Sequence, residues 1–186
     1  MQTIKPSNLI PCLNLGAGGQ PIPNAINVDM YPGPLIDQVV DLNKPWPWAD
    51  NSVYHIFSSH TVEHLDDVVH FMREANRVLA VGGTMELRLP YGWDTAGMAD
   101  PTHKRPMYPQ TFTAFSLNTV SKTDPRRFNF QEAHSRWDFG FEIDAITYIF
   151  RDWVKKLPFW RLYGFNLAMV LINVIQAFNI KFRKVK

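Results

Sequence analysis

The amino-acid sequence predicts an α/β domain built on a mostly parallel β-sheet. Short apolar runs of strand length recur through the first 90 residues, separated by loops and one helical pattern, and strands arranged in this way pair in parallel. The first run ends in the glycine-rich turn Gly16-Ala17-Gly18-Gly19, and the second ends in Asp29, which is the layout of a nucleoside-binding edge in an open α/β sheet. The 186 residues, 46% of them hydrophobic, suffice for a sizeable core, so we expect one domain over residues 1–186.

The first 90 residues contain five expected strands and one expected helix. The strands cover residues 9–15, 25–29, 38–42, 53–58 and 85–89. Residues 65–79 repeat apolar side chains at helical spacing, and we expect this helix to end at Gly82-Gly83, because glycine readily adopts the left-handed conformation that closes helices. Only nine residues, 16–24, separate the first two strands. An ordinary crossover needs about a dozen residues, so the first helix should be stunted or replaced by a turn.

The second half of the chain is predicted to add loops, helices and a final strand. The expected elements are a loop over 91–116 that holds a short helix over 109–115, an extended segment over 127–137, a segment over 142–156 that fits either a strand or a helix, and a longer helix over 159–179. Apolar and basic residues alternate over 180–186, which is the period of a half-exposed strand. We expect this last strand to run antiparallel at the edge of the sheet.

The glycine turn and Asp29 indicate a site for a nucleoside. Glycine lets a ligand touch the backbone where any Cβ would intrude, and a carboxylate can accept hydrogen bonds from both vicinal hydroxyls of a ribose. A dinucleotide fingerprint needs its third glycine at position 21, where the chain has Pro21, so NAD and FAD are disfavoured. A phosphate-binding loop needs Lys-Ser or Lys-Thr after its glycines, and neither follows here. What remains is a nucleoside without a phosphate chain.

Five stretches follow one another in this half of the chain: residues 13–19, 27–29, 41–42, 48–65 and 77–83. In this order they resemble the class I S-adenosylmethionine-dependent methyltransferases, specifically the small type-11-like group. The resemblance implies a Rossmann-like sheet of the seven-strand type, S-adenosyl-L-methionine (SAM) as cofactor and S-adenosyl-L-homocysteine (SAH) as product. It also implies that residues 1–90 form the cofactor-binding half, whereas residues 91–186 supply a substrate loop, a cover helix and the last strand.

The same resemblance implies which residues hold the cofactor. The expected contacts are Asn14, Gly16, Ala17, Gly18, Asp29, Met30, Asp41, Leu42, Ser59 and His60. Among them, Asp29 is expected to hold the ribose hydroxyls and Asp41 to accept from the adenine amino group, while Leu42 packs on the ring. Ser59 and His60 are expected under the sulfonium.

The stretch Asp100-Pro101-Thr102-His103 lies in a proline-bounded loop after the fifth expected strand, where enzymes of this family place substrate contacts. An imidazole can take a proton from an attacking hydroxyl or amine. We therefore expect His103 to act as a general base or a substrate ligand, with Asp100 orienting it, and His60 to complete the catalytic set. A purely structural role for this loop is the alternative.

Residues 60–64, His-Thr-Val-Glu-His, also match the H-x-x-E-H pattern of one zinc peptidase group. On a helix, His60 and His64 would share one face and could grip zinc, but that enzyme group needs a third ligand downstream, which the sequence does not reveal. The single cysteine, Cys12, excludes a disulfide framework and a cysteine-based zinc cage. We therefore expect no metal, and we interpret His64 as a helix-start residue that hydrogen-bonds into the loop.

The sequence favours a hydroxyl or amine of a small molecule, a sugar or a glycan as the methyl acceptor. Ser-Ser-His-Thr, rather than Asn-Pro-Pro-Tyr or Asp-Pro-Pro-Tyr, follows the fourth strand, and Cys12 lies in the first strand, away from any position for attack on a pyrimidine. Both observations disfavour nucleic acid. The alternatives are a SAM-binding module or partner subunit with little turnover, and a membrane-peripheral enzyme acting on a lipid-linked glycan.

Charge is unevenly spread along the chain, whose net charge is +2. Residues 151–186 carry eight basic side chains and one acidic one, a net +7, so the other 150 residues carry −5. A solvated face is the simplest explanation, although an anionic partner would also suit it. The uncharged stretch Leu162–Ile180 is long enough to cross a bilayer, but a core-packing helix is the favoured interpretation. We expect a cytoplasmic protein without a signal peptide, with membrane-surface attachment through residues 159–186 left open.

Overall fold

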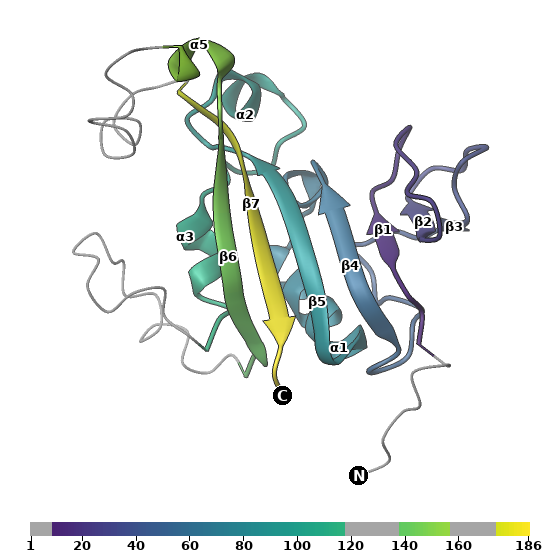
Figure 1. Ribbon diagram of the computed structural model, residues 1–186. Helices are drawn as coiled ribbons and strands as arrows, with labels where there is room; N and C mark the ends of the chain where they lie inside the picture. The colour runs from purple at the N-terminus through teal and green to yellow at the C-terminus, as the bar shows by residue number, and fades with distance from the viewer. Residues whose placement is uncertain (1–8, 118–137, 157–173) are drawn as a thin grey trace.

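The computed structural model describes residues 9–117, 138–156 and 174–186 (Figure 1). Seven strands form one sheet in the order β3-β2-β1-β4-β5-β7-β6. The strands are β1 (Leu13–Leu15), β2 (Ile26–Asp29), β3 (Gln38–Val39), β4 (Val53–Ser59), β5 (Leu79–Pro90), β6 (Phe141–Phe150) and β7 (Ile175–Lys184). The helices are the 3-10 helix η2 (Val62–His64), α1 (Val68–Val78), α2 (Thr95–Ala99), α3 (Pro109–Thr113) and α5 (Asp152–Lys155).

The directions of the strands confirm a mostly parallel sheet with an antiparallel C-terminal strand. Strands β1 to β5 pair in parallel, and β7 runs antiparallel to both of its neighbours. The position of β7 differs from the prediction, because it lies between β5 and β6 rather than at the edge. The edge strand is β6, in the segment whose pattern fits a strand or a helix equally. Alternation shows that one face of a strand is buried, but it does not show how many strands pair with it.

The predicted helix over 159–179 is wrong at its C-terminal end. Residues 175–179 are the first half of β7, and within them Ile175, Ala177 and Phe178 are buried. Residues 157–173, like the expected extended segment over 127–137, lie outside the described residues. Within the described ranges, no helix is long and apolar enough to span a membrane.

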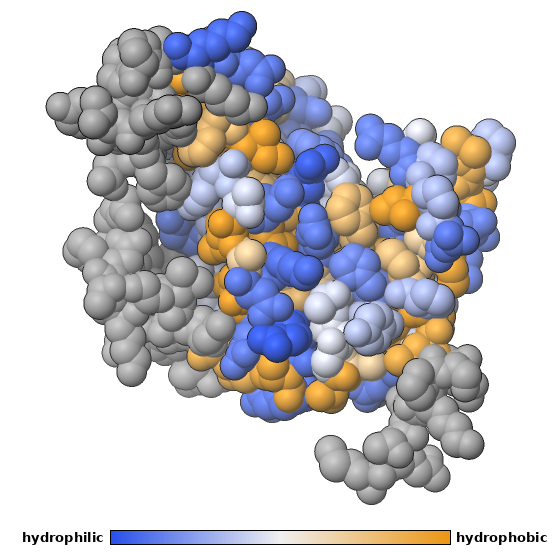
Figure 2. Space-filling model, in the orientation of Figure 1, coloured by the Kyte–Doolittle hydropathy of each residue, from blue (hydrophilic) through white to orange (hydrophobic). Residues whose placement is uncertain are grey.

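The described helices α1 and α3 cover one face of the sheet. Both lie behind it in Figure 1, and their side chains join the strands in one hydrophobic core, where the ring centroids of Phe112 and Phe178 are 6.3 Å apart. No described helix crosses the face toward the viewer. Strand side chains such as Glu86 and Lys181 are partly or fully exposed to solvent, and Figure 2 shows this face as a mixture of hydrophilic and hydrophobic residues.

The connection after β1 contains no helix, as its short length predicts. Its residues instead fold into turns held by two buried amides. Asn14 donates from Nδ2 to the carbonyl of Gln20 (3.1 Å) and to Oδ1 of Asn27 (2.9 Å), and Asn27 Oδ1 also accepts from the backbone N–H of Ile22 (2.8 Å). The next two connections, residues 30–37 and 40–52, likewise contain no helix. Loops therefore border the carboxyl ends of β1, β2 and β3.

Helix α1 begins at Val68 rather than at Leu65, because Asp67 caps it. The Asp67 carboxylate accepts hydrogen bonds from the backbone N–H groups of Val69 (2.8 Å) and His70 (3.1 Å). Such a cap satisfies N–H groups that have no partner within the helix. The short helix η2 precedes it.

The Gly82-Gly83 pair does not end α1 as predicted. The helix passes directly into β5 at Leu79, and both glycines lie within that strand. Strand β5 advances from Leu79 to Thr84 while its neighbour β4 advances only from Val53 to His55. Gly82, with a φ of +84°, accommodates the resulting bulge.

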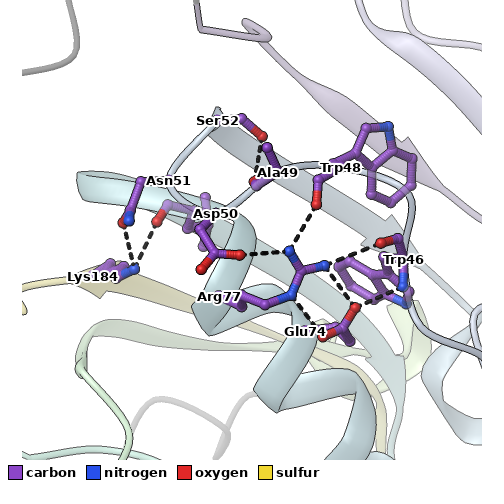
Figure 3. Close-up of polar contacts among 10 residues, drawn as sticks. Trp46, Trp48, Ala49, Asp50, Asn51, Ser52, Glu74, Arg77 and Lys184 are labelled. Carbon is purple, nitrogen blue, oxygen red and sulfur yellow. Dashed lines mark hydrogen bonds and ion pairs between the residues drawn. The ribbon is translucent and has the colours of Figure 1, made fainter.

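Arg77 of α1 holds the loop before β4 against the helix (Figure 3). Its guanidinium donates to the carbonyl oxygens of Trp46 (3.1 Å) and Trp48 (2.8 Å), to Asp50 (2.8 Å) and twice to Glu74 (2.9 and 2.8 Å). Glu74 also accepts from the backbone N–H of Trp46 (2.6 Å). The hydrogen bonds from Arg77 are the main cause of the lowered pKa of Glu74. An ion pair with backbone contacts thus anchors a connection that has no helix of its own.

Candidate functional site

A cavity of about 530 Å³ opens where β1, β2, β3 and β4 end. Its walls are Gly16, Gly18, Asp29, Met30, Tyr31, Val40, Asp41, Leu42, Asn43, His60, Thr61, His64, Leu65, Asp66 and Lys104. Ligands of open α/β sheets bind outside the carboxyl ends of the strands. Seven of the predicted site residues line this cavity, namely Gly16, Gly18, Asp29, Met30, Asp41, Leu42 and His60.

Gly16 is required both by its backbone conformation and by a neighbouring side chain. Its φ is +72°, in the left-handed region that residues with a side chain rarely adopt. A Cβ at this position would lie 2.0 Å from Oγ1 and 2.6 Å from Cγ2 of Thr61. Gly18 also has a positive φ (+50°), but a Cβ there would meet nothing within 4 Å. Glycine at position 16 therefore lets Thr61 pack against the loop and leaves bare backbone at the cavity wall.

Asp29 ties the glycine loop to the end of β2. Its Oδ2 accepts a hydrogen bond from the backbone N–H of Gly18 (2.9 Å), and its Oδ1 accepts from that of Tyr31 (3.1 Å). Each carboxylate oxygen has a second lone pair, so both oxygens can still accept from a pair of hydroxyls. The structure places Asp29 in the cavity wall as expected, and its role as a ribose ligand stays a prediction.

Asp41 lies in the same wall, on the segment after β3. Its Oδ1 accepts from the backbone N–H of Asn43 (3.0 Å), and Lys44 Nζ lies 3.4 Å from Oδ2. The hydrogen bond from Asn43, followed by the contacts from Lys44, lowers the pKa of Asp41, so this side chain is an ionised acceptor at neutral pH. Of its apolar neighbours in the wall, Leu42 is buried and Met30 is exposed.

Three predicted cofactor contacts do not line the cavity. Asn14 is buried and bonded to the turn after β1, as described above. Ala17 is also buried, and its backbone N–H donates to the carbonyl of Val28 (2.9 Å). Ser59 is half-buried at the end of β4, where its carbonyl accepts from Thr61 Oγ1 (3.2 Å). These residues support the cavity walls, and their contact with a cofactor stays a prediction.

His60 forms a conformationally strained corner of the cavity. Its φ is +53°, which is uncommon for a residue with a side chain, and its Nδ1 lies 3.3 Å from Oε1 of Glu63. Residues held in such conformations cluster at binding and catalytic sites. The helix that the zinc-peptidase pattern requires is not formed, because η2 covers only Val62–His64 and leaves His60 outside.

The loop after β5 brings His103 to His64 rather than into the cavity. The two ring centroids are 4.8 Å apart in an edge-to-face arrangement. His103 is largely buried, and its Nδ1 lies 3.0 Å from the carbonyl oxygen of Gly97. Its Nε2 is 3.8 Å from Oδ2 of Asp100, which is beyond hydrogen-bonding distance.

The Asp100 carboxylate hydrogen-bonds to Thr102, while its backbone carbonyl accepts from the N–H of His103 (3.2 Å). The role of Asp100 in orienting His103 stays a prediction. Its Oδ1 accepts from the hydroxyl (2.6 Å) and the backbone N–H (2.8 Å) of Thr102, and these two hydrogen bonds lower the pKa of Asp100. Thr102 Oγ1 in turn lies 3.0 Å from Nδ1 of His64. His64 thus hydrogen-bonds into the loop as expected, and it also lines the cavity. It is the last residue of η2 rather than a helix-start residue, because α1 begins only at Val68.

Besides His64, seven residues of the cavity wall are not predicted as site residues by the sequence: Tyr31, Val40, Asn43, Thr61, Leu65, Asp66 and Lys104. Thr61 faces Gly16, and the backbone N–H of Lys104 donates to the carbonyl of Glu63 (2.8 Å). Both belong to stretches that sequence analysis does single out, the H-x-x-E-H pattern and the loop of His103. Thr61 follows His60 and Lys104 follows His103 in the chain, and this adjacency could have predicted that both lie at the site.

Residues 25–87 match the sequence profile of a family described as a methyltransferase domain. A search of curated proteins by sequence found no relative. Among solved structures, a SAM-dependent methyltransferase from Archaeoglobus fulgidus superposes with a TM-score of 0.66 at 17% identity, over 95% of this chain and 86% of that chain. The chain has the class I methyltransferase fold.

Two further structures share this methyltransferase fold. One is in the complex between the Haloferax volcanii Trm112 methyltransferase activator and the putative methyltransferase (TM-score 0.56, 16% identity, 97% of this chain and 85% of that chain). The other is the [4+2]-cyclase SpnF (TM-score 0.57, 16% identity, 95% of this chain and 76% of that chain). The resemblance to class I methyltransferases is thereby confirmed. The glycine turn at 16–19 precedes the matched residues 25–87, and the fold brings both to one cavity.

Proposed function

We propose that this chain is a SAM-dependent methyltransferase that acts on a hydroxyl or amine of a small molecule, a sugar or a glycan. One observation carries the proposal: the bare backbone at Gly16 and the carboxylates of Asp29 and Asp41 line one cavity at the carboxyl ends of adjacent strands. Its volume of about 530 Å³ lies within the range of small-molecule sites.

The lining residues fit the chemistry of SAM. Its adenosine part offers hydroxyl and amino donors, and Asp29 and Asp41 are acceptors with free lone pairs. Gly16 lines the cavity without a side chain, and Thr61 occupies the place where its Cβ would lie. The bound cofactor would supply an activated methyl group on a sulfonium. The protein would then mainly hold acceptor and cofactor in alignment, which is a large part of the rate enhancement in such transfers.

An acceptor hydroxyl also needs a group that takes its proton, and the geometry favours His60 for this role. It lines the cavity, and half of its side-chain surface is exposed. Its Nδ1 lies 3.3 Å from the Glu63 carboxylate. His103 lies beside His64 and does not line the cavity. Any influence of His103 on the acceptor would therefore pass through His64.

Two other functions have specific support. Because this fold occurs in a protein described as a [4+2]-cyclase and in a complex with a methyltransferase activator, the fold alone does not determine turnover. A SAM-binding module or partner subunit is therefore the second candidate. The excess of basic residues over 151–186 supports the third, a cytoplasmic, membrane-peripheral enzyme that acts on a lipid-linked glycan.

Titration calorimetry with SAM and SAH tests the cofactor, and SAH release in the presence of a panel of sugar and small-molecule acceptors tests turnover. Absence of binding at millimolar ligand would overturn both the enzyme and the binding module. Binding without turnover on any acceptor would favour the module. Co-sedimentation with anionic vesicles, abolished by high salt, would favour the membrane-peripheral enzyme.

A further inference from the structure

Three potential metal ligands meet beside the cavity. Glu63 and His64 belong to η2, after β4, and His103 comes from the loop after β5. One ligand atom of each residue lies within 4.8 Å of the other two. We propose that Glu63, His64 and His103 bind a divalent transition-metal ion. Zinc is the best match, because two imidazoles and one carboxylate are a ligand set found in zinc enzymes.

The Glu63 carboxylate is the observation that points to a cation. Its side chain is fully buried, and neither oxygen has a hydrogen-bond partner among the described residues. His60 Nδ1 approaches Oε1 to 3.3 Å without forming a hydrogen bond. A buried carboxylate without hydrogen bonds is costly unless its charge is compensated. A metal ion would supply both the compensating charge and the missing contacts.

The nearby basic side chains are engaged elsewhere. Lys104 Nζ lies 3.2 Å from Oδ1 of Asp66. The Arg105 guanidinium donates to the carbonyl oxygens of Asp66 (2.6 Å) and Leu65 (3.3 Å). Neither cation is directed at Glu63, although both follow His103 directly in the chain. The loop therefore brings imidazoles, rather than ammonium or guanidinium groups, to the buried carboxylate.

Hydrogen bonds on Nδ1 leave Nε2 of both imidazoles available as a ligand. His103 Nδ1 faces the carbonyl oxygen of Gly97 (3.0 Å), which can only accept, so Nδ1 carries the proton and Nε2 has a free lone pair. His64 Nδ1 faces the hydroxyl of Thr102 (3.0 Å), whose own proton is donated to Asp100 at 2.6 Å. That hydroxyl must then accept from His64, which again leaves Nε2 free.

This arrangement is the one that orients histidine ligands in metalloproteins. A ligating imidazole usually donates its other N–H to a carbonyl, a carboxylate or a polar group held by one. Here Gly97 plays that part for His103, and the chain from Thr102 to Asp100 plays it for His64. The Asp100-Pro101-Thr102-His103 stretch thus provides one ligand and positions a second. The proposal departs from the sequence-based expectation of no metal, and its ligands differ from the zinc-peptidase pattern, which would use His60.

The separations within the cluster require a small contraction on binding. Ligand atoms about 2.1 Å from a tetrahedral zinc lie roughly 3.4 Å apart, against separations of up to 4.8 Å here. Side-chain rotations of His64 and His103 would close this difference. His64 also lines the cavity. If the chain is the methyltransferase proposed above, the ion would also have a role in catalysis. It would bind an acceptor hydroxyl and lower the pKa of that hydroxyl.

Metal binding can be tested on the full chain after treatment with a chelator, by titration with ZnCl₂ in calorimetry and in competition with a chromophoric chelator. We expect one equivalent of zinc per chain. Glu63→Gln, His64→Gln and His103→Gln should each lower zinc affinity by more than about 100-fold, and Thr102→Val, which disturbs only orientation, by about 10–100-fold. His70→Gln, at a histidine of α1 outside the cluster, is the matched control and should keep the affinity of the wild type.

Glu63→Gln separates loss of the metal from loss of the fold. It keeps the shape of the side chain and removes the buried charge, so the metal-free variant should melt at or above the temperature of the metal-free wild type. Zinc should raise the melting temperature of the wild type only. Sub-stoichiometric binding, or equal zinc affinity in wild type and Glu63→Gln, would overturn the proposal. SAH binding on the same samples keeps the two proposals apart: intact SAH binding without zinc binding refutes only the metal site, and the reverse refutes only the cofactor.

Discussion

Alanine at Gly16 should be far more disruptive than alanine at Gly18, although both glycines belong to one loop. Both have a positive φ, +72° and +50°, so both alanines carry the left-handed penalty of about 1–2 kcal/mol. Only at position 16 would the new Cβ overlap a neighbour, Thr61, at 2.0 Å from Oγ1 and 2.6 Å from Cγ2. Such overpacking adds about 1–3 kcal/mol. We expect a loss in free energy of unfolding of about 2–5 kcal/mol for Gly16→Ala and about 1–2 kcal/mol for Gly18→Ala.

Thr61 provides an internal check on this reasoning. Thr61→Ala removes Oγ1 and Cγ2 but keeps a Cβ that would lie 2.8 Å from the new one at position 16. It should therefore recover part of the loss in Gly16→Ala and none of the loss in Gly18→Ala. Urea unfolding followed by circular dichroism measures the free energies, and SAH calorimetry reports on the cavity. Equal losses in the two glycine variants, or zero coupling between positions 16 and 61 in a double-mutant cycle, would refute the argument.

Three further predictions concern the cavity and the loop before β4. Asp29→Ala should weaken SAH binding by about 1–3 kcal/mol, which is the usual effect of losing charged hydrogen bonds. The control Asp144→Ala, on β6, should leave SAH affinity unchanged. If calorimetry shows unchanged SAH affinity in Asp29→Ala, Asp29 does not hold the ribose. Arg77→Met removes five hydrogen bonds and should lower the free energy of unfolding by about 2–4 kcal/mol in urea; a loss under about 1 kcal/mol would contradict this role. Hydrogen bonds from Arg77 hold the pKa of Glu74 in the folded protein below its ordinary 4.5. Ionised Glu74 therefore stabilises the fold above pH 4.5. This stabilisation is lost as the pH falls through the lower pKa of the folded protein. Urea unfolding between about pH 3 and 6 should show a steeper acid loss in wild type than in Glu74→Gln, and parallel curves would count against it.

Local patterns sufficed to predict the parallel strands near the N-terminus. Each is a short apolar run bounded by turn residues, and the nine-residue connection over 16–24 correctly predicts the missing first helix. The place of β7 was not readable in this way. Phe178 pairs with Leu89 of β5 on one side and Tyr148 of β6 on the other, and neither partner is near it in the chain. Strand order depends on such long-range pairing, which periodicity does not encode.

In the candidate site, too, some residues were predictable from the sequence and others depended on tertiary structure. Gly16, Asp29 and Asp41 were predictable because each stands at or just beyond a strand end, and parallel strands bring their carboxyl ends to one edge. The contacts of Asp100 and His103 were not, because they depend on the path of the loop after β5. That path directs Asp100 to Thr102 and leaves His103 beside His64.

The sequence by itself determined the fold class and the sheet edge that carries the cavity, because glycine conformation, strand length and the acid after a strand are short-range properties of the chain. Only the tertiary structure decided the surroundings of Glu63. Pairing of β4 with β5 sets the loops that follow these strands next to each other, so residues 63, 64 and 103 meet although some forty positions separate them. A buried carboxylate acquires its chemistry from whichever groups the fold places around it, and here the fold places two oriented imidazoles there.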